Sequence, residues 1–210
     1  MNKWNLTTDS QGHCSNRLAS LRRQNGFTVV ELMISLVLLA IGAALAIPSY
    51  RQMVEKRQLT HGAEQIMAFV NTAKSEAVRR NQIVTVSYKR IDTDNWCVGM
   101  VVGTSACDCM ESNTAASDYC AIDSAPRIIN NAYVGNTKLV KEMTGADGNK
   151  FSFDPVRGIF TNLGKSLKVQ MRSDSQDYRL DLKVSNTGEA ILCSHDATYA
   201  VPGYGVCPQT

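Results

Sequence analysis

The feature that most constrains this chain of 210 residues is an apolar run from Phe27 to Ile47, interrupted only by Thr28, Glu31 and Ser35. A helix of about 20 residues spans the roughly 30 Å hydrocarbon core of a bilayer, so the run predicts a transmembrane helix. A carboxylate in that setting costs roughly 3 kcal/mol and by default marks function. Glu31 therefore calls for a partner.

Residues 1–26 are polar and basic, with a single acidic residue, Asp9, against Lys3, Arg17, Arg22 and Arg23. This composition indicates a targeting segment that is not part of the fold. Because its arginines closely precede the apolar run, the N-terminus is expected to stay cytoplasmic and the rest to be exported. The rest holds 18 basic and 18 acidic residues, so no bulk field would draw a nucleic acid to it.

Beyond Pro48, which would break or kink a helix, a helical pattern resumes. One stripe of apolar residues follows steps of three and four, namely Leu59, Ala63, Ile66, Val70, Ala73 and Ala77. Charged residues occupy the other face, and Arg79 and Arg80 are expected to interact with the C-terminal helix dipole. We expect one long helix from about 27 to 80, kinked near Pro48, whose second half packs on a domain.

After Asn81 the pattern changes to short alternating segments typical of strands. We expect strands at 83–90, 95–103, 149–154, 158–161, 166–172, 178–184 and 188–193. Between them, residues 104–125 form a long loop that would be hard to hold without cross-links. The predicted class is α+β, a long N-terminal helix packed on a C-terminal antiparallel β-sheet domain. The expected divisions are 1–26 (leader), 27–47 (transmembrane helix), 48–80 (amphipathic helix) and 81–210 (β-domain).

Of the seven cysteines, Cys14 lies in the leading segment and six lie beyond it, namely Cys97, Cys107, Cys109, Cys120, Cys193 and Cys207. An even number beyond a membrane-targeting segment favours disulfides in an oxidising compartment. Six cysteines permit 15 pairings, although the first four and the last two form separate groups. A Cys193–Cys207 bond would stabilise the C-terminal loop by roughly 3 kcal/mol.

The alternative interpretation of these cysteines is a metal site, because in the sequence Cys107 is close to Cys109 and His195 is close to Cys193. Structural zinc sites usually separate paired cysteines by two to four residues, whereas a single residue separates this pair. Asp147 and Asp154 could be imagined as calcium ligands, but such loop carboxylates are more often solvated. His13, His61 and His195 belong to no nucleophile or metal motif, and the glycines at 145–148 follow no strand-to-helix pattern. We expect no catalytic residue, metal or cofactor.

The segment "QNGFTVVELMISLVLLAIGAALAIPSY" resembles the N-terminus of type IV pilins and of the pseudopilins of type II secretion. The matching features are a basic leader ending in Gly26, then Phe27, Glu31, about twenty apolar residues and Pro48. Further on, "AFVNTAKSEAVRRNQIVTV", "FDPVRGIFT" and "VSNTGEAILC" resemble the GspH/FimT family of minor pilins and pseudopilins.

The resemblance implies that a prepilin peptidase cleaves between Gly26 and Phe27 and N-methylates the new amine of Phe27. A glycine suits that place because the backbone can approach the catalytic groups closely. It also implies that Glu31 meets the N-terminal amine of a neighbouring subunit. The alternative is that Glu31 has no role in assembly, because its carboxylate reaches the membrane–water interface or stays protonated. The implied partners are other minor and major pilins or pseudopilins, and the implied location is the inner membrane with the C-terminal domain in the periplasm.

The expected function is therefore that of a minor pilin taking part in type IV pilus assembly, at the priming or tip complex. The alternative is a minor pseudopilin of a type II secretion system, and the C-terminal cysteine pair favours the pilus because pilins often close a C-terminal loop this way.

A DNA-binding minor pilin is a third possibility. Relatives with that role carry arginines near the C-terminus, where this chain has Glu189 and Ile191, and residues 185–210 contain no Lys or Arg. Nucleic acid is therefore not expected as a partner. A fourth possibility is a soluble secreted protein cut at "ALA", residues 44–46, although the apolar run exceeds the usual 7 to 15 residues of a signal-peptide core.

Overall fold

The computed structural model describes residues 26–135, 137–139, 149–161, 167–175, 177–185 and 187–208. The expected leader up to residue 25, and the 145–148 segment with Asp147, lie outside the described residues. The chain divides into two compact units, Met1–Leu45 and Ala46–Thr210, and each is described by itself.

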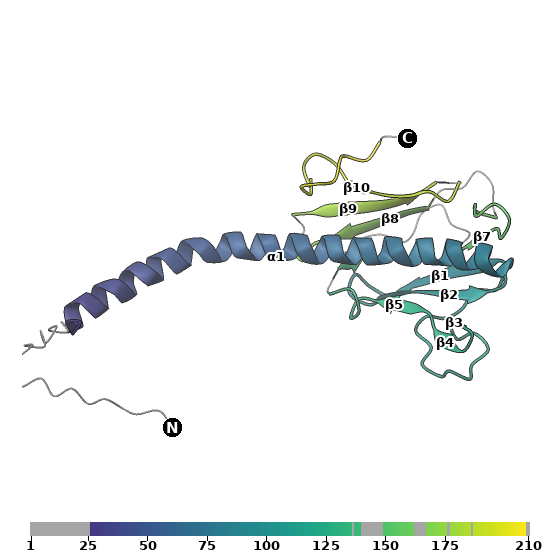
Figure 1. The fold of residues 1–210 in the computed structure, drawn as a ribbon, viewed down its shortest axis with the longest axis horizontal. Coiled ribbons are helices and arrows are strands. Elements are labelled where there is room, and N and C mark those ends of the chain that lie inside the picture. The colour runs from purple at the N-terminus through teal and green to yellow at the C-terminus, as the bar shows by residue number, and fades with distance from the viewer. Residues whose placement is uncertain are drawn as a thin grey trace, which may run out of the picture. The chain divides into compact units, whose positions relative to one another are not determined.

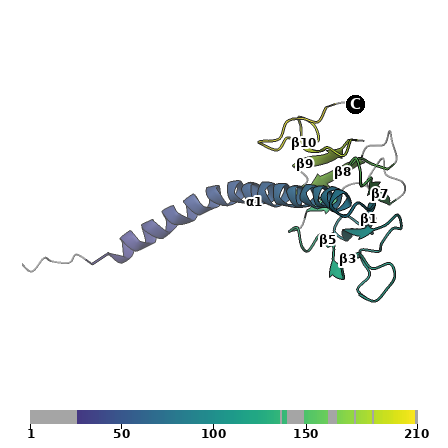
Figure 2. The same ribbon diagram turned by 45° about the vertical axis from the view of Figure 1, so that its right-hand side comes forward.

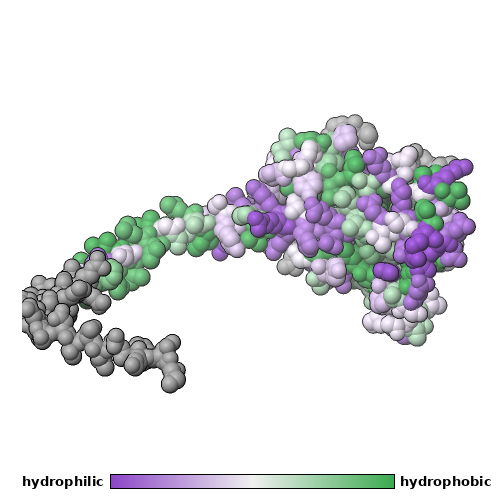
Figure 3. Space-filling view, viewed as in Figure 1, coloured by the Kyte–Doolittle hydropathy of each residue, from purple (hydrophilic) through white to green (hydrophobic). Residues whose placement is uncertain are grey.

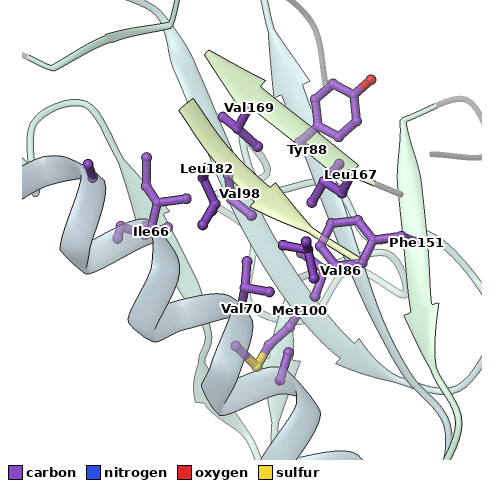
Figure 4. Packing of buried hydrophobic residues seen from close by; sticks show 14 of the residues in the cluster. Ile66, Val70, Val86, Tyr88, Val98, Met100, Phe151, Leu167, Val169 and Leu182 are labelled. Atoms are coloured by element: carbon purple, nitrogen blue, oxygen red, sulfur yellow. The ribbon is translucent and has the colours of Figure 1, made fainter. Parts of the chain in front are cut away.

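A single helix, α1, runs from Val29 to Arg80 and continues through Pro48. Its buried residues in the second unit are Leu59, Gly62, Ala63, Ile66, Val70, Ala73 and Ala77. The predicted stripe is confirmed, with Gly62 added to it. Figure 4 shows Ile66 and Val70 pointing from the helix towards strand residues such as Val98 and Leu182. The second half of α1 is therefore the core helix of the β-domain.

The first sheet is antiparallel and has the strand order β5-β2-β1-β7. Its strands are β1 (Val84–Arg90), β2 (Trp96–Val102), β5 (Ile128–Asn130) and β7 (Lys150–Phe153). Both faces of β1 are covered along its first five residues. One face meets the core, and on the other the hydroxyl of Ser87 accepts a hydrogen bond from the backbone N–H of Cys107 at 3.0 Å. The loop after β2 therefore covers the back of this sheet.

The second sheet is also antiparallel, in the order β10-β9-β8-β6. Its strands are β6 (Lys138–Leu139), β8 (Leu167–Arg172), β9 (Arg179–Val184) and β10 (Ala190–Ser194). Burial alternates strictly along β8, as expected where one face of a strand meets the core. Within the unit Ala46–Thr210, the strands β8, β9 and β10 lie on one side of α1 and β1, β2 and β5 on the other (Figures 1 and 2). The predicted α+β class is confirmed.

Some strand predictions differ from the structure. No strand forms at 158–161, where Phe160 makes an isolated bridge to Phe153 and its ring packs 5.3 Å, centroid to centroid, from that of Phe153. The expected loop 104–125 ends in a small hairpin of β3 (Ala121–Ile122) and β4 (Ala125–Pro126). Because β3 to β6 are two or three residues long, they carry too little alternation to be recognised in the sequence.

All six cysteines beyond residue 26 form disulfides, which confirms the expectation of disulfide bonds. The pairs are Cys97–Cys109, Cys107–Cys120 and Cys193–Cys207. Cys97, Cys107, Cys109 and Cys120 are buried together in one cluster. Two interleaved cross-links thus fasten the 104–125 loop against β2.

Gly99 makes this arrangement possible. A Cβ atom added at Gly99 would lie 2.3 Å from the Sγ of Cys120 and 3.0 Å from the Cβ of Cys109. No real Cβ tolerates such a contact, so β2 needs a residue without a side chain beneath the two disulfides.

Replacing Gly99 with Ala should therefore destabilise the β-domain by about 1–3 kcal/mol, the usual cost of overpacking a core. Urea denaturation of the unit Ala46–Thr210 measures this change. Gly205→Ala is the matched control, because its added Cβ meets nothing within 4 Å. Equal midpoints for the two variants would contradict the packing argument.

The C-terminal segment is tied to the helix by a tyrosine. The hydroxyl of Tyr204 donates a hydrogen bond to Oε1 of Glu64 at 2.6 Å. Burial first, and then this bond and the charge of Glu64, raise the pKa of Tyr204 to about 12. A raised tyrosine pKa favours the protonated form, so its contribution to stability is full below the ordinary value near 10 and is lost as the pH rises through about 12.

Absorbance titration should therefore show one tyrosine ionising near pH 12, and Tyr204→Phe should remove that transition. Glu64→Gln should move it part of the way towards the ordinary value, since burial remains as the larger cause. A titration unchanged by Tyr204→Phe would show that the group had been assigned wrongly.

Candidate functional site

The N-terminus of α1 is set by Thr28. The Oγ1 atom of Thr28 accepts a hydrogen bond from the backbone N–H of Glu31 at 3.2 Å, and its carbonyl accepts one from the N–H of Leu32 at 3.1 Å. Thr28 is thus the N-cap, and the Thr-x-x-Glu spacing is that of a capping box. The Thr-x-x-Glu spacing is a local signal that the sequence itself carries. It starts the helix two residues after Phe27, so a cut before Phe27 would leave the helix whole.

Glu31 stands in the first turn of α1, where a negative charge suits the helix dipole, and it is exposed. Among the described residues, no hydrogen bond or ion pair is recorded for its carboxylate. The only neighbouring polar side chain further along the helix, Ser35, donates its hydroxyl to the carbonyl of Glu31 at 2.8 Å. The hydroxyl of Ser35 is therefore satisfied within the helix, whereas the carboxylate of Glu31 accepts no hydrogen bond from residues 26 onwards that the structure describes.

The helix around Glu31 is covered by no other part of the described chain. Phe27 is 82% exposed, and the large aliphatic residues from Val29 to Ile47 are each more than half exposed. Figure 3 shows this segment as an almost unbroken apolar surface. By length and composition, α1 can cross a membrane. So large an apolar surface needs lipid or other apolar helices around it.

Of the residues proposed as sites from the sequence, Gly26, Phe27 and Glu31 lie in one continuous stretch, and Pro48 lies within the same helix in the second unit. The six cysteines are buried in the β-domain and form three disulfides. Two of these disulfides hold the 104–125 loop, and the third closes the C-terminal segment. The cysteines therefore shape the domain and are not available as metal ligands. Among the described residues, no group of three or more His, Cys, Asp or Glu could hold a metal ion.

The end of α1 is fixed by ion pairs that the sequence did not reveal. Nε of Arg80 lies 2.7 Å from Glu76, and Nη1 of Arg80 donates to Asp123 at 2.9 Å. Hydrogen bonds from Arg80 and then Arg79 hold the pKa of Glu76 below its usual value, and Arg80 likewise lowers the pKa of Asp123. The two arginines that were expected to interact with the helix dipole thus also pair with carboxylates, and Arg80 joins the helix end to the β3–β4 hairpin.

One buried polar cluster lies beneath the C-terminal segment. Asp181 of β9 is fully buried, and its Oδ2 lies 3.0 Å from Nζ of Lys168 and 2.9 Å from Nδ1 of His195. Lys168 and His195 reach this carboxylate from the surface, since their side chains are 41% and 27% exposed. His195, which had no role in the sequence, therefore holds the segment after β10 onto the sheet. Because the Asp181 carboxylate is enclosed, this cluster is structural.

Two family models match the chain. The Type II transport protein GspH matches residues 62–188, and the prokaryotic N-terminal methylation motif matches residues 21–47. The first match covers more than half of the chain, which therefore belongs to the GspH family. This is a family of structural pilins rather than of enzymes, and its members assemble with other pilins.

Two curated Pseudomonas aeruginosa proteins, each described as "Fimbrial protein", are 34% identical to this chain over 65 residues. The alignment covers 31% of this chain and 42% of each relative. Two crystal forms of the type IV minor pilin FimU from Pseudomonas aeruginosa are also similar, at 16% identity. They cover 72% and 70% of this chain and 98% of FimU, with TM-scores of 0.45 and 0.43.

Proposed function

We propose that the protein is a minor pilin that takes part in type IV pilus assembly, at the priming or tip complex. The observation that carries the proposal is a lone, exposed carboxylate in the first turn of an uncovered apolar helix, four residues after the Gly26–Phe27 junction. Such a helix needs neighbouring apolar helices around it.

In this proposal a prepilin peptidase cuts between Gly26 and Phe27 and methylates the new amine of Phe27. An α-amino group titrates near pH 7.7–8, so most of the N-terminal amines carry a positive charge at neutral pH. The chain keeps its apolar helix in the inner membrane and its β-domain in the periplasm until it enters a fibre. Three disulfides in the β-domain support this location, because disulfides persist in oxidising compartments such as the bacterial periplasm.

Glu31 then meets the amine of Phe27 on a neighbouring subunit. Within an apolar bundle, both charges lose their hydration, so each is stable there only when paired. The requirement to pair an amine at residue 27 with a carboxylate at residue 31 of the next subunit fixes the axial stagger between two helices. The apolar surface supplies most of the contact area, and the ion pair selects the register.

The second candidate is a minor pseudopilin of a type II secretion system, and the printed name of the family, Type II transport protein GspH, supports it. The pilus is favoured by the Cys193–Cys207 bond across the C-terminal segment and by the two relatives described as fimbrial. Both candidates use the same helix and the same residue pair, so they differ in partners and not in mechanism. A neighbouring gene set of minor pilins and an adhesin would support the pilus, and secretion genes would support the pseudopilus.

Replacing Glu31 with Ala should leave membrane insertion and cleavage intact but lower incorporation into the fibre. A hydrogen bond to a charged group contributes about 1.5–3 kcal/mol, so incorporation should fall about tenfold or more. Immunoblotting of sheared fibres against the membrane fraction measures the ratio.

Ser35→Ala is the matched control, since Ser35 lies one turn further along the same apolar surface and bonds only within the helix. Unchanged assembly of Glu31→Ala, or an equal defect in Ser35→Ala, would contradict the proposed role of the carboxylate.

A further inference from the structure

The second sheet carries a concentration of positive charge on the face that points away from α1. Along β8 and β9 the residues Leu167, Val169, Met171, Leu180, Leu182 and Val184 are buried in the core. Successive side chains of a strand point to opposite faces, so the residues between them share the other face. The cations there are Lys138 of β6, Lys168 and Arg172 of β8, and Arg179 and Lys183 of β9, and we call them the basic face.

The strand register brings these cations directly opposite one another. Lys168 pairs with Lys183, Arg172 pairs with Arg179, and Arg172 also pairs with Lys138. Like charges directly opposite on neighbouring strands are destabilising. Five cations in this register therefore oppose the folding of the sheet unless negative groups offset them.

The chain offsets only some of them. Lys168 pairs with the buried Asp181, and Lys138 lies 2.7 Å from Asp174. Arg172, Arg179 and Lys183 form no ion pair within 4 Å among the described residues. Lys138 first, and then Arg172, lower the pKa of Asp174, and the guanidinium of Arg179 lies over the ring of Tyr199. Nζ of Lys183 donates to the carbonyl of Pro208 at 2.6 Å. In the described part of this chain, Lys183 and Arg179 thus have no negative partner, and Arg172 shares Asp174 with Lys138.

Lys168 and Lys183 line a hollow of about 590 Å³. Its lining also includes His195, Ile191, Glu189 and Asp196. A single carboxylate entering it can accept hydrogen bonds from the two ammonium groups. A nucleic-acid backbone, with a charge at every phosphate, would also meet the carboxylates of Glu189 and Asp196. The lining thus carries two lysines and two carboxylates, so an anion fits the hollow only where it lies against Lys168 and Lys183, which are directly opposite each other in the strand register. A single acidic side chain can do so, whereas a run of phosphates cannot avoid the two carboxylates.

The opposite side of the same domain has the complementary charge. The loop 104–126 contains Asp108, Glu111, Asp118 and Asp123 and neither Lys nor Arg. Asp108 pairs with Lys89 and Asp123 with Arg80, so Glu111 and Asp118 are the carboxylates that remain for a partner. Asp118 is exposed, and it forms no ion pair with any residue that the structure describes. The loop is fastened by two disulfides, so presenting it to a partner costs little ordering entropy. Its hairpin β3–β4 lies on the other side of α1 from β10 (Figures 1 and 2).

We propose that the basic face binds the acidic loop 104–126 of a second copy of this chain, with Asp118 entering the hollow beside Lys168 and Lys183. Because the two surfaces lie on opposite sides of the domain, one molecule cannot satisfy both itself, and the contact is heterologous. Contacts of this kind build rings or open fibres. Its place in a fibre rests on the proposed function, but the contact itself does not need the membrane helix.

The unit Ala46–Thr210 is suited to the test, because it contains the whole buried core from Leu59 to Val201 and all three disulfides. Analytical ultracentrifugation at low salt should detect self-association of this unit. Association should weaken at least tenfold in about 0.5 M sodium chloride, where charges are screened within a few ångströms. A unit that stays monomeric at low salt would overturn the proposal.

A charge exchange gives the sharper comparison. Lys183→Glu and Asp118→Lys should each weaken self-association at least tenfold, and an equimolar mixture of the two variants should associate again, since each supplies the charge that the other has lost. Failure of the mixture to associate would overturn the proposed pairing. If either residue served only the fold, mixing the two variants would not restore self-association.

Thermal melting separates a lost contact from a lost fold. Lys183→Glu loses the hydrogen bond to the carbonyl of Pro208 but places a carboxylate opposite Lys168, so its melting temperature should stay within a few degrees of that of the wild type. A clear fall would mean that Lys183 serves the fold. Binding of a duplex DNA fragment that is lost with Lys183→Glu, without self-association of the wild type, would instead assign the basic face to a polyanion. Any of these failures would leave the fibre assay of Glu31→Ala unaffected.

Discussion

The β-domain depends on the burial of one narrow stripe of α1 between two sheets. The stripe combines small and large aliphatic residues, and the small ones decide how closely the strands approach. At Gly62 an added Cβ would lie 1.9 Å from Oγ1 of Thr137, so the segment before β6 rests directly on the helix backbone. Ile66 and Val70 fill the space between the sheets (Figure 4). Both sheets are therefore organised by a helix that neither could replace, and the second half of α1 cannot leave the domain without exposing its core.

The first half of the same helix, in contrast to the second, is not buried by the described part of the chain. Its apolar residues have no cover in the described chain, and its one carboxylate has no recorded donor there. Membership of the GspH family and the N-terminal methylation motif give these two facts one explanation. A helix that is fixed to a domain at one end and uncovered at the other is a means of adding that domain to a bundle of like helices. The disulfides, the Tyr204–Glu64 bond and the Asp181 cluster all stabilise the domain that is carried.

Much of this arrangement could be predicted from the sequence, because the relevant signals are local and periodic. The stripe from Leu59 to Ala77 and the strands β1, β2, β7, β8, β9 and β10 follow from alternation that extends over four or more residues. The pairing of the cysteines could not be predicted. The sequence shows which cysteines are close along the chain, but it does not show which of them the folded strands and loops bring into contact. Gly99 and Asp181 were missed for the same reason. Each is explained by a neighbour that is distant in the sequence, and neither carries a local signal. Thr28 is different, since its capping spacing with Glu31 could have been recognised.

The central claim is that cleavage before Phe27 creates the amine that Glu31 needs, and that the apolar helix stays with the mature protein. The most direct measurement is the N-terminal sequence and mass of the mature protein recovered from its native host. The account predicts a chain that begins at Phe27 and carries a methyl group on that amine. A mature chain that begins at Ile47, after the small residues at 44–46, would lack the helix segment with Glu31 and would contradict the account.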